Sequence, residues 1–498
     1  MKRLLIAAVA LTAACGSTVQ VTGQAQVGSG SDQGLGGTTG TSTGAGSTGA
    51  TTTDATTGVT APTGTTTGAG TTSTGSTGNV VQAGPGGTTG VANPLPSKGS
   101  ASHEPIEIGF VTTSVGNAAA LGVNAGSTYT DKAMYDAFVA EYNLGGGIAG
   151  HRIKPVYGET DTASSNWSNE FAQACATLTQ DHKVKAVIGY VFVFLQNFEG
   201  CLAKAKVPHL SGGYQPGDVA DQRMYPTLVS TTHPTVDGAN LTSLTGALAT
   251  GLLTTKTKLG IIVDTCANGD RAFKNSTEPW LKAHSIHYQV VTGSCGNGAS
   301  DASGAAAQVS NAELQFASSG VDLVFSGAVE ILLFMASAES QGYHPKYLTA
   351  VGGAALQANA PANQMKNLHT FGWMPAVDVD PQHQPYPKTP AQVRCIGMLK
   401  KHGLNPAAYN DFMQAYATCD GLDMYAKALA QTGSTEATGI VRAVLASLPA
   451  LHGAATYNGG FLAGANQRGG PAVYREAAWD TGCSCMSYRG PIRKVPTP

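Results

Sequence analysis

Charged side chains are scarce in this chain of 498 residues. Asp, Glu, Lys and Arg together make up 12% of it, and the formal net charge is −2. Because binding to nucleic acid depends on many basic side chains that neutralise phosphates, this composition predicts no nucleic-acid partner. Hydrophobic residues make up 42%, enough for substantial cores, and the length allows two or more domains.

Motifs for catalysis and metal binding are also lacking. The histidines are scattered without an H-x-x-x-H pair, and the C-x-C of Cys483 and Cys485 offers only half of a zinc site. No nucleophile can be assembled with a general base and an orienting acid. GTSTG at 40–44 matches the G-x-S-x-G elbow by chance, since that elbow needs a strand before it and a helix after it. We therefore predict no enzyme activity, no metal and no cofactor.

The N-terminus predicts export from the cytoplasm. Two basic residues precede an apolar run at 4–14, which is too short to cross a bilayer and is typical of a signal peptide at 1–14. The run ends in LTAAC, which resembles the lipobox of bacterial lipoproteins, although Thr12 stands where leucine is usual. This resemblance implies that a diacylated Cys15 anchors the protein on the outer face of a membrane. The alternative is simple cleavage before an unmodified cysteine.

A low-complexity segment follows the signal. Residues 15–104 consist largely of Gly, Thr, Ser and Ala, so they hold too little apolar surface to offset the entropy of ordering. We predict a disordered linker that begins at the lipid-attached residue. A flexible chain of about 85 residues has an r.m.s. reach of roughly 50 Å, which lifts a folded domain off the membrane.

Nine cysteines are present, of which eight follow Cys15, and an even number in an exported protein favours disulfides. Eight cysteines allow roughly a hundred connectivities, so any one pairing is a hypothesis among many. We expect structural disulfides in preference to a redox or metal site. Pairing of nearest neighbours in the sequence gives Cys175–Cys201, Cys266–Cys295 and Cys395–Cys419 and leaves Cys483 and Cys485.

Strand-like and helix-like segments alternate from residue 105 onward, which is typical of parallel α/β sheets. The first run has strands at 106–113, 152–159, 185–190, 207–211 and 227–232 and helices at 129–143, 168–181 and 196–206. The second run has strands at 259–264, 287–291 and 322–327 and helices at 241–253, 270–283, 305–318 and 331–341. The last part is predicted to be helical at 390–401, 409–431 and 435–448. Two runs of similar length predict two similar lobes.

A glycine-rich stretch, NLGGGIAGHR at 143–152, contains the G-x-G-x-x-G spacing of a dinucleotide-binding loop. That fingerprint must follow a strand and open a helix. Here the order is reversed, because a helix ends near Asn143 and a strand begins at Arg152. Gly145 stands where a C-cap glycine belongs, and the glycines after it are predicted to form a tight turn between helix and strand.

The same stretch carries a family resemblance. The matching residues are Asn143, Gly146, Gly147, Ile148, Gly150 and Arg152, followed by Glu159 and Asp161. This pattern resembles the Leu/Ile/Val-type solute-binding proteins of ABC importers, which have the type I periplasmic-binding fold. Segments 108–126, 186–190 and 207–213 are similar to the first, third and fourth strands of that family with their loops. The resemblance extends over roughly 105–490.

The resemblance implies an α/β fold of two Rossmann-like lobes joined by hinge crossings. Lobe 1 is expected to comprise 105–232 with 372–455, and lobe 2 is expected to comprise 233–371 with 456–490. Open α/β sheets bind ligands outside the carboxyl ends of their strands, here between lobes that close by hinge motion. The ligand-binding candidates are Ser114, Asn117, Tyr190, Phe192, Ser211, Gly213, Tyr214 and Gln215 in lobe 1 and Asp264, Asn268, Gly327 and Glu330 in lobe 2.

The resemblance also implies how an amino acid is held, and the chain departs from that pattern. The family fixes the ligand carboxylate with hydroxyls and backbone amides after its third and fourth strands and neutralises the ammonium with an acid from lobe 2. Here YVFVF at 190–194 replaces a run usually rich in serine, and no carboxylate lies near 351–354. An ammonium buried without a partner is costly, so Glu330 or Asp264 has to replace that acid. A larger, more apolar or neutral ligand facing the aromatic residues of lobe 1 is the alternative hypothesis.

The sequence therefore predicts an extracytoplasmic, lipid-anchored solute-binding protein for ABC-type import. Its ligand is expected to be amino-acid-like or another small carboxylate or apolar molecule, its partners are ABC permease subunits and the membrane, and it is expected to be a monomer. The main alternative is a cell-surface sensor or envelope interaction protein that uses the same fold without transport. A secreted hydrolase is the weakest alternative because no catalytic motif is present.

Overall fold

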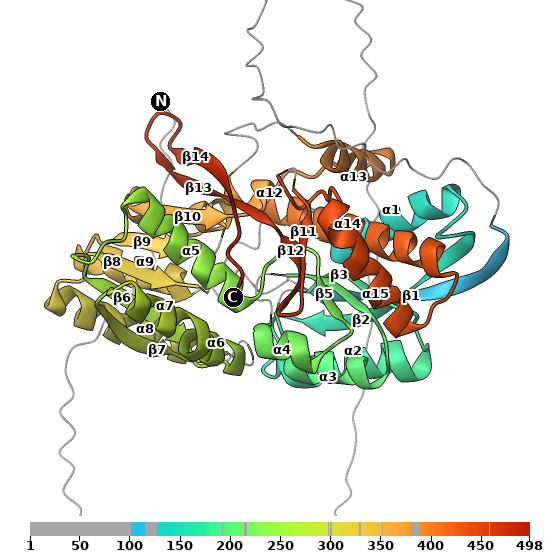
Figure 1. Ribbon diagram of the computed structural model, residues 1–498, viewed down its shortest axis with the longest axis horizontal. Coiled ribbons are helices and arrows are strands. Elements are labelled where there is room, and N and C mark those ends of the chain that lie inside the picture. The colour runs from blue at the N-terminus through green and yellow to red at the C-terminus, as the bar shows by residue number, and fades with distance from the viewer. Residues whose placement is uncertain are drawn as a thin grey trace, which may run out of the picture. The chain divides into compact units, whose positions relative to one another are not determined.

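Two sheets, each built mainly from parallel strands, make up the folded part of this computed structural model (Figure 1). The structure describes residues 101–498 except 115–126, 192, 214–216, 297, 299–300, 328–329, 351, 380–387 and 458. The predicted signal peptide, Cys15, most of the linker, and the candidates Asn117, Phe192, Tyr214 and Gln215 lie outside the described residues. All described residues belong to one compact unit.

The first sheet has the strand order β11-β12-β5-β4-β3-β1-β2. Strands β1 to β5 are parallel, β12 continues the sheet parallel to β5, and β11 is antiparallel to β12. The strands are β1 (His103–Ser114), β2 (His151–Asp161), β3 (Val187–Tyr190), β4 (His209–Gly212), β5 (Leu228–Ser230), β11 (Phe461–Gly464) and β12 (Gln467–Pro471). The chain segments between and after them form α1 (Asp131–Leu144), α2 (Trp167–Ala176), η2 (Thr177–Asp181), α3 (Gln196–Lys204), α4 (Val219–Met224), α13 (Pro390–Lys401), α14 (Tyr409–Thr432), α15 (Ala437–Ser447) and η5 (Leu448–Ala450).

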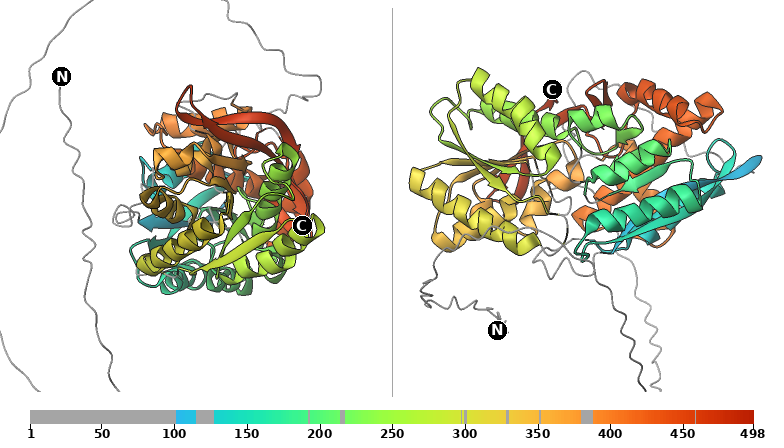
Figure 2. Two further views of the ribbon diagram at one scale, coloured as in Figure 1. Left: turned by 90° about the vertical axis from the view of Figure 1, so that its left-hand side faces the viewer. Right: turned by 90° about the horizontal axis from the view of Figure 1, so that it is seen from below.

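The second sheet has the order β14-β13-β10-β9-β8-β6-β7. Its β6 to β10 are parallel, and β13 and β14 extend the sheet as antiparallel strands. The strands are β6 (Leu259–Asp264), β7 (Tyr288–Gly293), β8 (Leu323–Ser326), β9 (Lys346–Thr349), β10 (Leu368–Gly372), β13 (Val473–Asp480) and β14 (Cys485–Lys494). Its helices are α5 (Val236–Thr250), α6 (Ala267–Ala272), η3 (Phe273–Thr277), α7 (Glu278–Ala283), α8 (Ala302–Ser319), α9 (Glu330–Gln341), α10 (Gly353–Gln357), α11 (Ala362–Met365) and α12 (Pro375–Asp378). Helices flank each sheet, as the views from two further directions show (Figure 2).

This architecture confirms the predicted fold class, because each sheet has the parallel α/β pattern of a Rossmann-like lobe. The predicted strand at 259–264 and the predicted helix at 390–401 coincide with β6 and α13. The predicted helix at 270–283 begins earlier, at Ala267, and runs through α6, η3 and α7. None of the helices in the described part of the chain is long and apolar enough to cross a bilayer.

The C-terminal region differs from the expectation. The sequence predicted helices as the last elements, but four strands, β11 to β14, follow α15. The segment 456–490 was assigned to lobe 2, whereas β11 and β12 within it belong to the first sheet, where Gly469 pairs with Ser230 of β5. The sequence did not predict these strands, because a segment such as QRGGP in β12 lacks the alternation of apolar and polar side chains that indicates a strand. The remaining lobe boundaries stay a prediction.

The glycine stretch after α1 forms the turn that the sequence predicted. Helix α1 ends at Leu144 with Gly145 as its C-cap, and Gly147 donates a backbone hydrogen bond to Tyr142 (2.8 Å). Gly147 has a φ of +82°, and a Cβ on it would lie 1.9 Å from the carbonyl oxygen of His151. The turn leads to the start of β2, at the opposite end of the strand from the carboxyl end, where ligands bind. The structure therefore gives these glycines a role in chain reversal.

Four disulfides link elements that are close in sequence. Cys175–Cys201 joins α2 to α3, Cys266–Cys295 joins the ends of β6 and β7, and Cys395–Cys419 joins α13 to α14. Cys483–Cys485 closes the turn between β13 and β14. The structure thus contains the nearest-neighbour pairs and also joins the two remaining cysteines.

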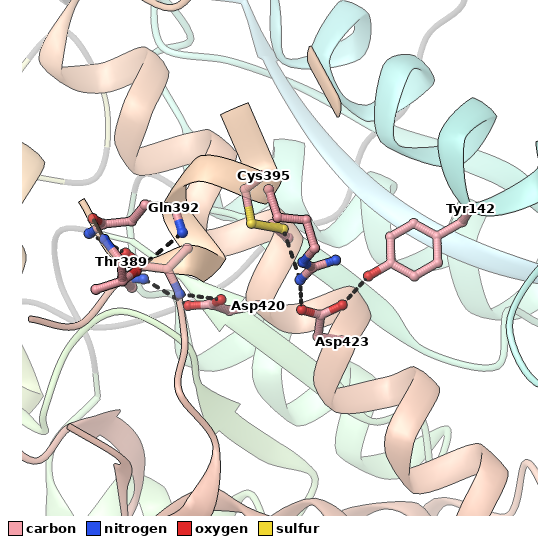
Figure 3. The surroundings of a disulfide bond; sticks show 10 residues. Tyr142, Thr389, Gln392, Cys395, Asp420 and Asp423 are labelled. Carbon is pink, nitrogen blue, oxygen red and sulfur yellow. Dashed lines mark hydrogen bonds and ion pairs between the residues drawn. A yellow bond between two sulfur atoms is a disulfide. The ribbon is translucent and has the colours of Figure 1, made fainter. Parts of the chain in front are cut away.

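The disulfide between α13 and α14 lies within a dense polar network (Figure 3). Asp423 on α14 accepts a hydrogen bond from the Tyr142 hydroxyl and pairs with Arg394 on α13. One turn earlier, Asp420 accepts backbone hydrogen bonds from Ala454 (2.7 Å) and its neighbour at 455 (2.9 Å). Burial raises the pKa of Asp420 to about 6. These contacts fix the chain that returns toward β11 onto α14, whose residues 410–422 are all buried.

Within the described residues the chain passes between the two sheets three times: from β5 to β6, from β10 to β11 and from β12 to β13. Asp378, at the end of α12, lies on the second of these crossings. Its carboxylate accepts hydrogen bonds from the hydroxyls of Tyr457 (2.7 Å), just before β11, and Tyr488 (3.3 Å), on β14. Burial raises the pKa of Asp378 to about 7. These bonds join the two ends of this crossing, near α12 and just before β11, to β14 of the second sheet.

Candidate functional site

A pocket lies at the carboxyl ends of the second sheet. The ends of β6 and β8 and the residues just after β9 and β10 contribute to it, together with the first half of α5, α6 and η3. Open α/β sheets bind ligands at this edge, so the pocket is the leading candidate site. Its lining residues are His233, Val236, Ala239, Asn240, Ile261, Ile262, Val263, Asp264, Asn268, Gly269, Phe273, Thr277, Phe325, Gly327, Ala350 and Trp373.

Two carboxyl groups lie together at this pocket. Asp264 lines it and accepts a hydrogen bond from the backbone N–H of Cys266 (3.0 Å). Glu330 opens α9 beside it: a Cβ on Gly293, which pairs with Asp264 across the sheet, would lie 3.4 Å from Glu330 Cγ. Glu330 is 7% exposed, and its Oε2 has no hydrogen-bond partner in the described structure. Burial raises the pKa of Asp264 to about 6, and burial together with the Asp264 charge raises the pKa of Glu330 to about 7.

A third oxygen acceptor faces the pocket from α5. Asn240 is 8% exposed and donates a hydrogen bond from Nδ2 to Thr277 Oγ1 (3.2 Å). Its Oδ1 has no partner in the described part of the chain. A Cβ on Gly327, which also lines the pocket, would lie 2.4 Å from that oxygen. The absence of a side chain at Gly327 therefore leaves room for the Asn240 oxygen at the pocket wall.

Aromatic rings form much of the remaining wall. Trp373, just after β10, packs edge-on against His233 with ring centroids 5.6 Å apart. Burial lowers the pKa of His233 to about 3, so this imidazole is neutral at physiological pH. Phe273 and Phe325 add apolar surface. The wall therefore suits an apolar ligand body, and no lysine or arginine is present among the described lining residues.

The corresponding edge of the first sheet forms a smaller pocket. Its backbone amides are already engaged: Val191 donates to the Gly212 carbonyl (2.6 Å), and Gly213 donates to Thr232 Oγ1 (3.1 Å). Tyr190 is buried at the end of β3, and burial raises the pKa of its hydroxyl well above the ordinary value. The lining residues are Val191, Val193, Phe194, Glu199, Ser211, Gly213, Gly217, Gln222, Leu228 and Ser230.

An ion pair connects α6 of the second sheet with α4 of the first. Arg271 Nε and Nη2 donate to the two carboxylate oxygens of Asp218 at 2.7 and 3.0 Å, and Nη2 also donates to Asp221 at 2.8 Å. The Asp218 and Asp221 side chains are 2% and 0% exposed, and that of Arg271 is 29% exposed. Burial and the adjacent Asp218 charge raise the pKa of Asp221 to about 7. Among the described residues, the guanidinium of Arg271 is thus the only cation that pairs with these two carboxylates.

A protein-family model described as periplasmic binding protein matches residues 105–475. The chain belongs to the periplasmic binding protein family. Membership confirms the predicted role, a solute-binding protein of ABC-type import, and implies a location outside the cytoplasm. Comparison with curated proteins gives no match.

Several solved structures share the fold of this periplasmic binding protein. An ABC transporter substrate-binding protein from Desulfitobacterium hafniense in complex with Leu is 17% identical, with a TM-score of 0.52 over 78% of this chain and 100% of that one. A fatty acid ABC transporter substrate-binding protein from Thermomonospora curvata is 16% identical, with a TM-score of 0.54 over 80% and 97%. A solute-binding protein from Rhodopseudomonas palustris BisB5 in complex with 3,4-dihydroxy benzoic acid is 14% identical, with a TM-score of 0.53 over 79% and 98%.

The predicted ligand contacts are spread over several places in this periplasmic binding protein. Asp264, Asn268 and Gly327 come together in the pocket of the second sheet, with Glu330 next to Asp264. Ser211 and Gly213 line the smaller pocket of the first sheet. Ser114 is exposed at the end of β1 and Tyr190 is buried, and neither lines either pocket. The role of each in ligand binding remains a prediction.

The sequence missed several pocket residues. Asn240 and Thr277 lie inside helical segments, whereas the carboxyl-end rule indicates only the loops that follow strands. Trp373 follows β10, a strand that the sequence did not predict. Gly352 and Gly353, where the family acid was expected, pack against Val377 and against Met486 of β14. The only available signal was the order of strands, since the residue after each strand of a parallel sheet is a ligand candidate.

Proposed function

We propose that this protein captures a small organic solute in the pocket at the carboxyl ends of β6 and β8, closes its lobes over the solute and presents it to ABC permease subunits. The observation that carries this proposal is the pocket itself, which combines an apolar wall with unpartnered oxygen acceptors. Small-molecule sites have this composition, because apolar surface supplies affinity and a few polar groups supply orientation. The ligand contacts we propose are Asp264, Asn240, Asn268 and Trp373.

The related structures support a solute of modest size without identifying it. The proteins named above were solved with leucine or 3,4-dihydroxy benzoic acid or are described as binding fatty acids. Because the same fold holds such different molecules, the pocket residues and not the fold decide the ligand. In this chain Asn240 and Gly327 both line the pocket, and we propose that the solute contacts Asn240.

We also propose that Cys15 carries a lipid and that the protein acts as a monomer without enzymatic activity. Two acyl chains give stable membrane attachment, and the linker at 15–104 lets the folded part reach a permease. Metabolic labelling with a radioactive fatty acid tests the anchor. The wild type should be labelled, and Cys15→Ser should be unlabelled and released from the membrane.

A thermal-shift screen of small metabolites with the purified protein tests solute capture. A ligand that binds only the folded state at a hundred times its Kd stabilises that state by about 2.7 kcal/mol. Gly327→Leu should abolish the response to every hit, because its side chain fills the pocket in front of Asn240. Gly397→Leu on α13, where a Cβ meets nothing within 4 Å, is the matched control and should respond like the wild type. A hit that Gly327→Leu binds unchanged contradicts the proposed pocket.

A further inference from the structure

The charged side chains that the structure describes at the pocket are all acidic. Asp264 lines it and Glu330 lies next to Asp264, yet the described lining residues include no lysine or arginine, and the lining His233 is neutral. The nearest arginine along the chain, Arg271 on α6, is engaged by Asp218 and Asp221. A carboxylate confined to a low-dielectric site without a counter-ion is unfavourable, and a ligand cation removes that cost.

Unpartnered acceptors are a second observation that supports the same ligand charge. Asn240 Oδ1 is buried at the pocket wall against Gly327 and has no partner among the described residues. Glu330 Oε2 is likewise buried without a partner. A buried acceptor left without a donor costs about 1–3 kcal/mol. A ligand whose N–H groups donate to these two acceptors therefore gains binding free energy at each of them. An ammonium carries such donors together with positive charge.

The backbone amides described at the end of the first sheet argue against a carboxylate group on the ligand. A ligand carboxylate at the ends of β3 and β4 would require free backbone N–H groups. Those of Val191 and Gly213 already donate to the Gly212 carbonyl and to Thr232 Oγ1. An anion there would have to break these bonds, so neither described amide is available to a carboxylate.

We propose that the solute is an organic amine: a cation with an apolar body and no carboxylate, whose ammonium faces Asp264, Glu330 and Asn240 Oδ1 while its body packs on Trp373 and Phe273. This inference rests on the proposed function and specifies the ligand class of the same pocket. The ring of Trp373 adds a face that attracts cations. An amino acid meets only half of this arrangement, because its carboxylate finds no free amide at Val191 or Gly213.

Two series of compounds, each with one kind of apolar body and different polar groups, test the inference. Leucine, 3-methylbutylamine, 3-methylbutanol and 3-methylbutanoate share a branched alkyl chain and differ in charge; 2-phenylethylamine, 2-phenylethanol, 3-phenylpropanoate and phenylalanine form a larger set. Isothermal titration with the purified protein measures each Kd. The amine of at least one set should bind at least tenfold more tightly than the corresponding amino acid and alcohol, and the carboxylates should not bind.

Variants of the acids provide the second readout. Glu330→Gln and Asp264→Asn keep the shape of the side chain and remove its charge, so each should weaken amine binding about tenfold while binding of the alcohol stays unchanged. Asp136→Asn is the control, because Asp136 lies on α1 and pairs with the exposed Lys132 at 2.7 Å. It should bind the amine like the wild type. A loss of alcohol binding in the acid variants would indicate a structural effect and contradict the assigned role.

The outcomes separate this inference from the proposed function. If leucine, a carboxylate or a neutral compound binds in the pocket more tightly than every amine, the inference is wrong and solute capture stands. The same holds if the metabolite screen gives hits that Gly327→Leu abolishes and no amine binds. If no compound of any charge binds in the screen, the proposed function fails, and the ligand class fails with it.

Discussion

The ion pair between Arg271 and the two aspartates of α4 is the contact whose removal has the most definite consequence. In Arg271→Ala the carboxylates of Asp218 and Asp221 keep their burial and lose their only cation among the described residues. Removing one partner of a fully buried pair costs about 3–5 kcal/mol. Because the Arg271 side chain is 29% exposed, solvent screens part of this interaction. We therefore expect Arg271→Ala to lower the free energy of unfolding by about 2 kcal/mol.

Differential scanning calorimetry measures this effect. For a lobe of roughly 150–250 residues, about 2 kcal/mol corresponds to a Tm lowered by about 4–8 °C. Lys274→Ala is the matched control on the adjoining η3, because Lys274 and Asp270 form an exposed i,i+4 pair, which contributes about 0.3–0.5 kcal/mol. The α6–α4 contact also connects the two sheets, so small-angle X-ray scattering should detect a larger radius of gyration in Arg271→Ala than in the control.

The pH dependence of the variant follows from Asp221, whose pKa is raised to about 7 by burial and by Asp218. A carboxyl with a raised pKa stabilises the folded state when protonated, and this contribution is lost as the pH rises through the folded-state pKa. The Tm difference between the wild type and Arg271→Ala should therefore be larger at pH 8 than at pH 5. If Arg271→Ala loses no more stability than Lys274→Ala at pH 8, the ion pair does not hold α6 to α4, and the reasoning is refuted.

Three further predictions concern the scaffold. Gly147→Ala should lower the free energy of unfolding by more than about 2 kcal/mol in a denaturant titration, because its Cβ would meet the His151 carbonyl at a φ of +82°. A loss as small as that of Gly397→Ala would contradict the role of Gly147 in the turn. The wild type should lose stability as the pH rises from about 4 to about 7 because the pKa of Asp378 is raised to about 7, and Asp378→Asn should flatten that part of the profile; an unchanged profile would exclude this carboxyl as its source. A disulfide stabilises the fold by restricting the unfolded chain, and it does so more strongly when it closes a longer loop. Replacing both cysteines should therefore cost about 3.5 kcal/mol for the α13–α14 disulfide, with a sequence separation of 24, and about 1.5 kcal/mol for the β13–β14 turn disulfide, with a separation of 2. Equal losses by calorimetry would contradict this reasoning.

The parallel α/β part of the fold was predictable because its strands and helices carry their own signals. LGIIVD in β6 is a continuous apolar run, as expected for a strand covered on both faces, and α1 begins with a capping threonine and ends at a glycine. The strands after α15 carry no such signal. Gly469 in β12 has no side chain to pack, and its place beside Ser230 of β5 depends on contacts between segments more than 200 residues apart. Strand propensity of this kind is set by tertiary context.

The candidate site was predictable only where the strand order alone determines it. Asp264 follows β6 directly and Gly327 follows β8, so the carboxyl-end rule finds both. Asn240 lies in α5, whose residues 237–244 are all buried, and nothing in the sequence separates the side that faces the pocket from the sides that face the core. The position of its Oδ1 at the pocket wall depends on the missing side chain at Gly327, a relation between residues 87 positions apart that exists only in the folded chain.

Charge and space in the pocket have a common consequence for specificity. Any side chain at Gly327 would collide with Asn240 Oδ1, because its Cβ would lie 2.4 Å from that oxygen. With glycine there, Asn240 on α5 and the acid at the end of β6 line the same pocket, while the described amides of Val191 and Gly213 in the first sheet donate within the chain. Discrimination against anions then comes from the repulsion of uncompensated carboxylates as much as from attraction of the right ligand. On the proposed function, we therefore expect variants at the pocket of the second sheet to change ligand selectivity more than variants at the pocket of the first sheet.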